Sequence, residues 1–197
     1  MSFGSRQPPI SDALRGYLDL LLSPRAPTHI LGPSQRQATA ARHTRPALRL
    51  VHSLSPPHGA HVADLGAGAG AFAVLAGNAW PCTQVCAIDR RRENVAFLED
   101  VARLLRLTNL RAECADVKPG NAPLALRHRF SLIVVRALAE PETSARIARS
   151  IAAPSASIVL HHTTPLPALG HLSLVPVATW DLCDEFQRLF ATELRSR

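Results

Sequence analysis

The residues with the clearest chemical potential lie in a short stretch in which glycine alternates with alanine. Gly66, Gly68 and Gly70 follow an apolar run of the kind that forms a β-strand. Glycines at the carboxyl end of a strand let the backbone turn tightly and approach a ligand without a Cβ atom in the way, and the helix that follows can face the ligand with its amino end. The stretch therefore predicts a nucleotide-type cofactor loop. Small residues that only ease strand–helix packing would give the same pattern.

Acidic residues at the ends of two further predicted strands favour the cofactor interpretation. Asp89 closes the second predicted strand, where its carboxylate can accept hydrogen bonds from both ribose hydroxyls. Asp116 follows the third predicted strand, where it can accept a hydrogen bond from an adenine amino group. Because the carboxyl ends of parallel strands meet at one sheet edge, we expect both acids, and Arg90 beside Asp89, to share a pocket with the glycine loop.

Asp64 decides between two possible cofactors. The glycine spacing also fits the dinucleotide pattern, with Ala71 as its third small residue. Dinucleotide-binding strands are usually apolar two residues before the first glycine, whereas this chain has Asp64 there. An acid at this place resembles the Asp-x-Gly-x-Gly-x-Gly motif of class I S-adenosylmethionine-dependent methyltransferases, where this region approaches the cationic methionine moiety. That resemblance implies S-adenosylmethionine as the cofactor, with a protein that mainly orients the methyl acceptor.

The elements that must position these residues change character near residue 60. Before it, helical spacing predicts one helix that ends at Pro24 and a second over about 34–54 that is interrupted or kinked at Pro46. After it, apolar runs alternate with helical segments, which is typical of a parallel α/β sheet. We therefore predict a basic helical N-terminal cap over residues 1–59 and, over 60–197, a Rossmann-like domain with a mostly parallel, doubly wound sheet. The predicted strands are 61–65, 84–88, 109–114, 130–135 and 157–161, and the predicted helices are 70–79, 91–106 and 141–152.

The tail after residue 170 allows two structures. An alternating run from residue 171 predicts a strand. Over residues 181–194 the apolar positions recur at helical spacing and favour a helix, while a closing antiparallel hairpin remains open.

The charge is strongly basic and carried almost wholly by arginine. The formal net charge is +7, 21 of the 22 basic residues are arginines, and residues 1–60 hold seven arginines against two acids. Arginine matches phosphate geometry, so an anionic partner such as RNA is expected, although a general compositional bias would also raise the arginine content. Hydrophobic residues make up 47% of the chain, which is ample for a core.

Several classes of protein are disfavoured by what the sequence lacks. The longest apolar runs are shorter than the ~18 to 20 residues of a membrane span, and the first residues lack the apolar core of a signal peptide. The four cysteines form no CxxC pair, and the adjacent His161 and His162 would alternate faces on a strand. We therefore expect a cytoplasmic protein that binds neither a membrane nor a metal. We also expect a monomer, although no motif bears on the oligomeric state.

Read together, the motifs are similar to those of the glucose-inhibited division protein B (RsmG) family, the guanine-N7 methyltransferases of bacterial small-subunit ribosomal RNA. The resemblance covers roughly residues 11–161. The matching motifs are Asp64-Leu65-Gly66-Ala67-Gly68-Ala69-Gly70, Asp89 with Phe97-Leu98, Leu105-Arg106-Leu107-Thr108-Asn109-Leu110, Arg136-Ala137-Leu138-Ala139 and, in the N-terminal helices, Tyr17-Leu18 and Arg42-His43.

The resemblance implies an S-adenosylmethionine-dependent enzyme that methylates guanine N7 in that RNA. Arg136, at the end of the fourth predicted strand, would hold the guanine edge or a phosphate, unless it pairs with nearby Glu140. The residues expected to bind the RNA are Arg42, Arg45, Arg91 and Arg92, and those expected to bind the cofactor are Asp64, Gly66, Gly68, Gly70, Asp89, Arg90 and Asp116.

The chain also departs from the family pattern at positions that matter for these roles. The family has a basic Lys-Arg pair where this chain has Glu93 and Asn94, and its glycine loop continues with Phe-Pro-Gly where this chain has Ala71, Phe72 and Ala73. The departures leave two alternatives open. The chain could be a diverged homologue that binds the cofactor or RNA without catalysis, or a methyltransferase of a small molecule.

Overall fold

The computed structural model describes residues 10–27, 29, 36–136, 138–162, 174–181 and 188–194. The side chains that it describes are those of residues 11–27, 29, 43–136 and 138–161. Its helices are α1 (Ile10–Leu22), α2 (Arg36–Ser53), α3 (Ala71–Ala79), α4 (Arg92–Leu104) and α5 (Pro141–Arg149), with one 3-10 turn, η2 (Leu124–Leu126). Its strands are β1 (His61–Leu65), β2 (Gln84–Asp89), β3 (Leu110–Cys114), β4 (Phe130–Arg136), β5 (Ala152–His162), β6 (Leu174–Asp181) and β7 (Arg188–Leu194).

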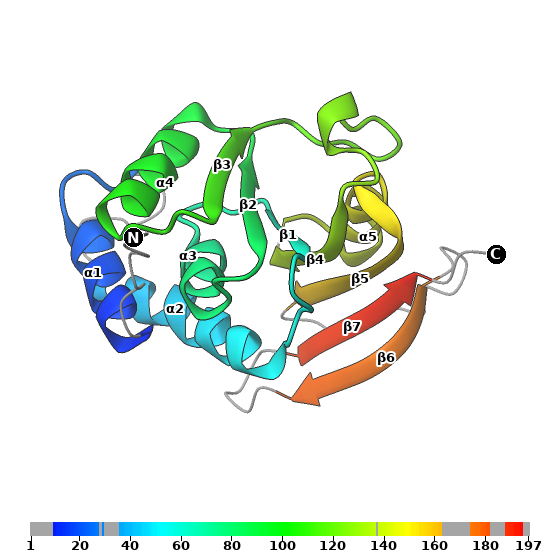
Figure 1. Cartoon of the computed structure of the whole chain (residues 1–197), viewed down its shortest axis with the longest axis horizontal. Helices are drawn as coiled ribbons and strands as arrows, with labels where there is room; N and C mark the ends of the chain where they lie inside the picture. The colour runs from blue at the N-terminus through cyan, green and yellow to red at the C-terminus, as the bar shows by residue number, and fades with distance from the viewer. Residues whose placement is uncertain are drawn as a thin grey trace, which may run out of the picture.

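The seven strands form one sheet in the order β3-β2-β1-β4-β5-β7-β6 (Figure 1). Strands β1 to β5 pair in parallel, and β7 runs antiparallel to both β5 and β6. Each parallel strand agrees with a predicted one, although β5 begins five residues earlier than the predicted strand. The predicted α/β fold with a mostly parallel sheet is confirmed.

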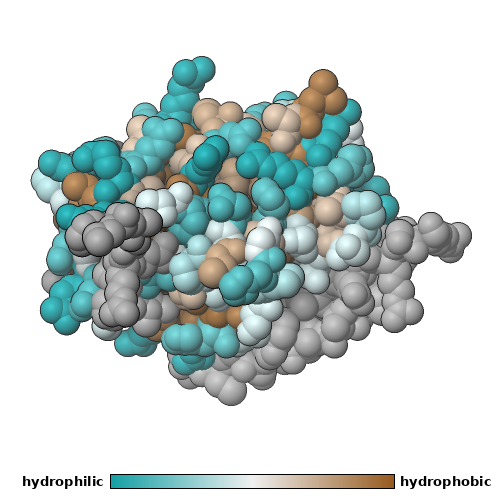
Figure 2. Space-filling model, in the orientation of Figure 1, coloured by the Kyte–Doolittle hydropathy of each residue, from teal (hydrophilic) through white to brown (hydrophobic). Residues whose placement is uncertain are grey.

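Alternating side chains of the parallel strands enter two separate cores, as expected for strands buried on both faces. Helices α1, α2, α3 and α4 contribute to the core on one face, which includes Val62, Val85 and Val134. Helix α5 contributes to the core on the other face, with Ala63, Ile88 and Ile133, together with residues of the connection from β3 to β4 (Figure 1). In Figure 2, hydrophilic side chains cover much of the visible surface and the hydrophobic areas on it are small and separate.

The two N-terminal helices form as predicted. Helix α1 presents buried Ala13, Tyr17 and Leu21, which are spaced by four residues and so share one helix face. Helix α2 continues through Pro46. Both helices belong to the core that α3 and α4 share, so the cap packs on the sheet domain as part of one core.

The preference for a helix over residues 181–194 is wrong for Asp181, which ends β6, and for residues 188–194, and the alternative antiparallel pairing is observed. Residues 188–194 form β7, whose backbone pairs with β5 on one side and β6 on the other. Backbone pairing with both β5 and β6 outweighs a local apolar spacing, which in a short segment does not separate helix from strand. The predicted strand from residue 171 is observed over Leu174–Asp181, while residues 171–173 and 182–187 lie outside the described residues.

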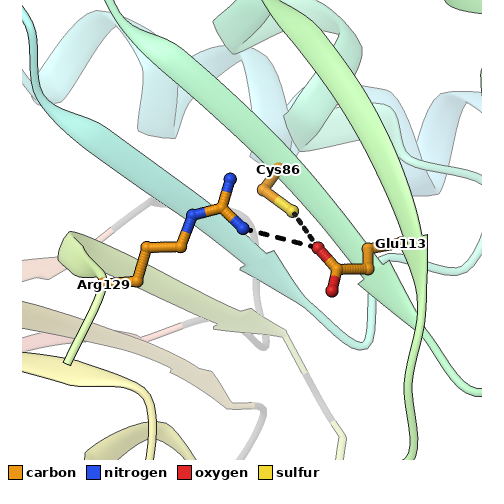
Figure 3. A network of polar contacts seen from close by, with 3 residues as sticks. All are labelled: Cys86, Glu113 and Arg129. Atoms are coloured by element: carbon orange, nitrogen blue, oxygen red, sulfur yellow. Dashed lines mark hydrogen bonds and ion pairs between the residues drawn. The ribbon is translucent and has the colours of Figure 1, made fainter. Parts of the chain in front are cut away.

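A small polar network lies on the face of the sheet that α5 covers, beside β2 and β3 (Figure 3). The Cys86 thiol donates to the Glu113 carboxylate at 3.8 Å, and an Arg129 guanidinium nitrogen lies 3.5 Å from the same oxygen. Burial, and then the neighbouring Glu113 charge, raise the pKa of Cys86 to about 12. This thiol is therefore protonated at neutral pH and is not a nucleophile.

Candidate cofactor-binding site

The glycine loop crosses from the end of β1 to the start of α3 over the end of β2. The backbone carbonyl of Ile88 accepts hydrogen bonds from the amides of Gly66 at 2.9 Å and Ala67 at 3.0 Å. Gly66 and Gly68 both have positive φ, which disfavours other residues. A Cβ atom at Gly66 would overlap the side chain of Leu138, whereas one at Gly68 would project into open space. The loop at Gly68 therefore leaves room for a ligand to approach the backbone.

Asp89 ties the loop to the end of β2 through both carboxylate oxygens. One oxygen accepts the Gly68 amide at 2.8 Å, and the other accepts the Arg91 amide at 2.9 Å. The residue is 8% exposed. Each carboxylate oxygen can accept a second hydrogen bond, so the carboxylate can still accept two donors from a ligand.

A cavity of about 290 Å³ opens at this edge, beside the loop, the end of β2 and the residues that follow β3 and β4. This volume is near the lower end of the usual range for ligand pockets, roughly 300 to 1,000 Å³. The structure brings together at the cavity the following residues from the predicted sets: Gly66, Gly68, Asp89, Arg90, Arg91, Asp116 and Arg136.

Two of the predicted cofactor residues, Gly70 and Asp64, do not line the cavity. Gly70 is the N-cap residue of α3, has positive φ and packs against Leu98. Asp64 is 1% exposed, and one of its oxygens accepts the Ala73 amide in the first turn of α3 at 3.1 Å. It therefore caps α3 from the neighbouring strand, where a negative charge is favourable.

The other Asp64 oxygen has no hydrogen-bond partner among the described residues. Burial raises the pKa of the Asp64 carboxyl, while the nearby Arg136 charge and the Ala73 hydrogen bond lower it in part. A cation or a hydrogen-bond donor that reached this oxygen would stabilise the ionised form. The residue thus has a structural function and an unused acceptor.

Arg136 ends β4 at the cavity and connects it to the N-terminal cap. Its Nη1 donates to the backbone carbonyl of His43 in α2 at 3.2 Å, and its buried Nε has no partner within the described part of the chain. In the same part of the chain it forms no ion pair with Glu140, so the alternative pairing of these two residues is not observed. One cationic group therefore faces the cavity at the end of the fourth strand.

The other predicted cations are more dispersed. Arg91 is the N-cap residue of α4 and Arg92 is its first residue, and both are exposed, as is Arg45 on α2. Arg42 lies on α2, but its side chain is outside the described residues. Asp116 is exposed at the cavity and pairs with Lys118 at 3.3 Å.

The structure adds residues to the site that the sequence did not assign to it. Asn94 and Leu138 line the cavity, as does His29, which lies between α1 and α2 and whose Nδ1 is 3.4 Å from the Glu93 carboxylate. In addition, the buried Tyr17 hydroxyl donates to the Ala69 carbonyl of the glycine loop at 3.0 Å. Tyr17 and Ala69 are 52 residues apart in the sequence, and no sequence pattern marks their contact.

The strand order, the antiparallel β7 and the glycine loop after β1 define the class I methyltransferase fold. A solved structure with this fold, a SAM-dependent methyltransferase from Aquifex aeolicus, aligns with a TM-score of 0.60 and 15% identity over 94% of this chain and 98% of that one. The model of the GidB family, described as rRNA small subunit methyltransferase G, matches residues 10–164. The chain therefore belongs to this family, and the predicted resemblance is confirmed.

Two relatives share the family description. Ribosomal RNA small subunit methyltransferase G of Trichormus variabilis is 27% identical over 139 residues, which cover 71% of this chain and 50% of that protein. The protein of the same name from Lachnoclostridium phytofermentans is 25% identical over 131 residues, which cover 66% of this chain and 54% of that protein. The chain thus spans about half the length of these relatives. Family membership supports the predicted methyltransferase activity with S-adenosylmethionine as the cofactor.

None of the helices in the described residues is long and apolar enough to span a membrane. The same residues also contain no group of three or more histidine, cysteine, aspartate or glutamate side chains that could hold a metal ion.

Proposed function

We propose that this chain is an S-adenosylmethionine-dependent methyltransferase whose acceptor is guanine N7 in small-subunit ribosomal RNA. The observation that supports the cofactor site most directly is the junction of Gly68 and Asp89 at the edge of the cavity. Membership of the rRNA small subunit methyltransferase G family supports the acceptor.

The residues at the site fit a nucleoside with a cationic tail. Asp89 accepts hydrogen bonds from the ribose hydroxyls, and Asp116 accepts one from the adenine amino group. The glycine loop admits the nucleoside at Gly68, where a Cβ atom would enter open space. Asp64, through its unpartnered oxygen, attracts the methionine ammonium group from below the loop. Gly66 and Gly70 keep the loop in shape, and Arg90 closes the pocket beside Asp89.

When bound, S-adenosylmethionine supplies a sulfonium methyl group whose leaving group is a neutral thioether. Guanine N7 carries a lone pair and no proton, so the protein need not supply a general base for the transfer. The protein's contribution is to hold the base so that N7 lies in line with the methyl–sulfur bond. We assign this orientation to Arg136, whose guanidinium can donate to the guanine edge.

The RNA backbone is bound by the arginines around the pocket. In the proposal, Arg91 and Arg92 on α4 and Arg42 and Arg45 on α2 contact phosphates. The basic cap of residues 1–59 thus binds RNA, while residues 60–197 hold the cofactor. The protein acts as a monomer in the cytoplasm.

One observation favours a second candidate, a homologue that binds the cofactor without methylating RNA. Where the family has its basic pair, Glu93 is exposed and contacts His29, and Asn94 is buried. Both positions lack the charge that would attract a phosphate. Transfer of labelled methyl groups decides between the candidates.

The test begins with calorimetric titration of the protein with S-adenosylmethionine and with S-adenosylhomocysteine. Binding of both is expected, followed by transfer of tritiated methyl groups to undermethylated small-subunit RNA. Cofactor binding without RNA labelling would favour the second candidate or a small-molecule acceptor. The absence of any binding would overturn the proposal.

Asp89→Ala should weaken binding of S-adenosylhomocysteine by about tenfold to a hundredfold, since it removes charge-assisted hydrogen bonds. Asp89→Asn should weaken it less, because the amide oxygen keeps one acceptor for the loop. Asp100→Ala is the matched control, because Asp100 is an exposed acid on α4 that pairs with Arg103. Wild-type affinity in Asp89→Ala would contradict the ribose assignment.

A further inference from the structure

Asn94 is a buried residue that lines the cofactor cavity and whose side-chain oxygen has no hydrogen-bond partner among the described residues. It lies in the first turn of α4, is 3% exposed and lines the cavity with Gly68, Asp89 and Arg91. Its backbone amide donates to the Arg91 carbonyl, whereas its side-chain oxygen has no hydrogen-bond partner in the described residues. The wall of the pocket thus contains a side-chain amide whose oxygen accepts no hydrogen bond from the described residues.

A buried amide oxygen without a partner lowers the stability of the ligand-free protein. Leaving a buried acceptor unsatisfied destabilises the folded state, so an apolar residue of similar size would serve the empty protein better. Asn94 also lies within α4, and leucine has a higher helix propensity than asparagine. The structure gives Asn94 no role in folding that would offset these losses, which points to a partner outside the chain.

The turn between β2 and α4 indicates which part of a bound ligand would contact the Asn94 side chain. The Asp89 carboxylate accepts the Arg91 amide, and the Arg91 carbonyl accepts the Asn94 amide. Asn94 is therefore held on the Asp89 side of the cavity, whereas Asp116 and Val117 line the side that follows β3. A ligand group that lies beside Asp89 would therefore also lie near Asn94.

We propose that the side-chain amide of Asn94 forms a hydrogen bond with one of the two ribose hydroxyls that Asp89 holds in the bound nucleoside. The inference rests on the proposed function, because it assumes that the pocket binds S-adenosylmethionine. It makes Asn94 a binding residue that selects a vicinal diol, and it gives a function to a position where this chain departs from the basic pair of its family.

The test combines ligand affinity with the stability of the empty protein. Calorimetry with S-adenosylhomocysteine should show binding about tenfold weaker in Asn94→Ala and Asn94→Leu than in the wild type. Without ligand, the melting temperature of Asn94→Leu should equal or exceed that of the wild type, because a buried unsatisfied amide is removed. Asn78→Ala is the matched control: Asn78 is buried in α3 away from the cavity, so its loss should lower stability and leave affinity unchanged.

Analogues of S-adenosylhomocysteine that lack the 2′ or the 3′ hydroxyl identify the contact. The wild type should bind both analogues more weakly than the parent compound, because each lacks a hydroxyl that the pocket holds. Asn94→Ala should lose the discrimination against one of them and bind that analogue and its parent compound with similar affinity. Undiminished discrimination against both analogues in Asn94→Ala, or wild-type affinity in both Asn94 variants, would overturn the inference and leave the proposed function intact. A wild-type protein that does not bind S-adenosylhomocysteine would overturn the proposed function and this inference with it.

Discussion

The two oxygens of the Asp64 carboxylate have different surroundings. One caps α3 through the Ala73 amide, and the other is buried without a partner. Capping alone does not require a buried acid at this position, because serine or threonine at the N-cap position also satisfies the first amides of a helix. The proposed attraction of the methionine ammonium group explains why an acid is present, and its cost to the empty protein can be measured.

The pKa of Asp64 is raised in the folded protein, so the unfolded chain releases the proton first as pH rises. Stability is therefore lost as pH rises from near the ordinary value of 3.8 towards the raised folded pKa, after which it levels off. Asp64→Asn lacks this titration and should gain stability relative to the wild type between pH 4 and pH 7. Urea unfolding of both proteins across this range measures the trend, with Asp100→Asn as an exposed control. If the wild type instead became more stable relative to Asp64→Asn as pH rises, the raised pKa of Asp64 would be contradicted.

At the scale of elements, helix α1 supports the glycine loop through Tyr17. The hydroxyl is buried, and burial raises its pKa well above the ordinary value, so it remains a donor to the Ala69 carbonyl. The loop is thus held from two sides, by Asp89 at Gly68 and by α1 at Ala69. The conformation of the loop therefore depends on the position of the N-terminal cap.

Tyr17→Phe should lower the free energy of unfolding by about 1–3 kcal/mol and weaken cofactor binding severalfold, because the Ala69 carbonyl loses its donor. Leu21→Ala is the comparison on the same helix. Leu21 is fully buried, so this change should cost about 2–5 kcal/mol through lost packing, with little effect on affinity. Equal affinities of Tyr17→Phe and wild type would show that α1 only packs on the loop. Chemical denaturation and calorimetry provide both readouts.

The sequence predicted the elements that depend on local pattern. The apolar runs that form β1 to β5 are continuous because both faces of these strands are buried, and glycine spacing marks the loop directly. Pairing and burial at a distance were not predictable in this way. Residues 188–194 have apolar spacing that fits a helix until β5 and β6 supply backbone partners. Likewise, Asn94 looks like an ordinary polar residue of α4, and only the assembled cavity shows that it is buried and unpartnered.

For the whole molecule, the cap and the sheet domain share one apolar core. Tyr17 and Leu21 of α1 and Leu50 of α2 are fully buried in the same core as Phe72 of α3. Burial of each large side chain contributes roughly 1.5–3 kcal/mol, and a protein of this size is stable by only about 5–15 kcal/mol. We therefore expect that residues 60–197 do not fold without the cap.

Expression of residues 60–197 alone should give a chain without cooperative thermal unfolding and without affinity for S-adenosylhomocysteine. The control is the full chain with a protease site at the exposed residues 57–59, cut after folding. Its two pieces should remain together in gel filtration and retain affinity. A truncated chain that melts cooperatively would show that residues 60–197 fold without the cap. Circular dichroism follows the melting.

The position of β7 has a consequence for how the molecule is made. Translation completes β6 before β7, yet in the described sheet β7 is the neighbour of β6 and separates it from β5. The newly made β6 therefore has no strand to pair with until β7 is made. During that time the edge of β5 can pair with another strand. Until residue 194 leaves the ribosome, we expect the nascent chain to be prone to strand pairing with other chains.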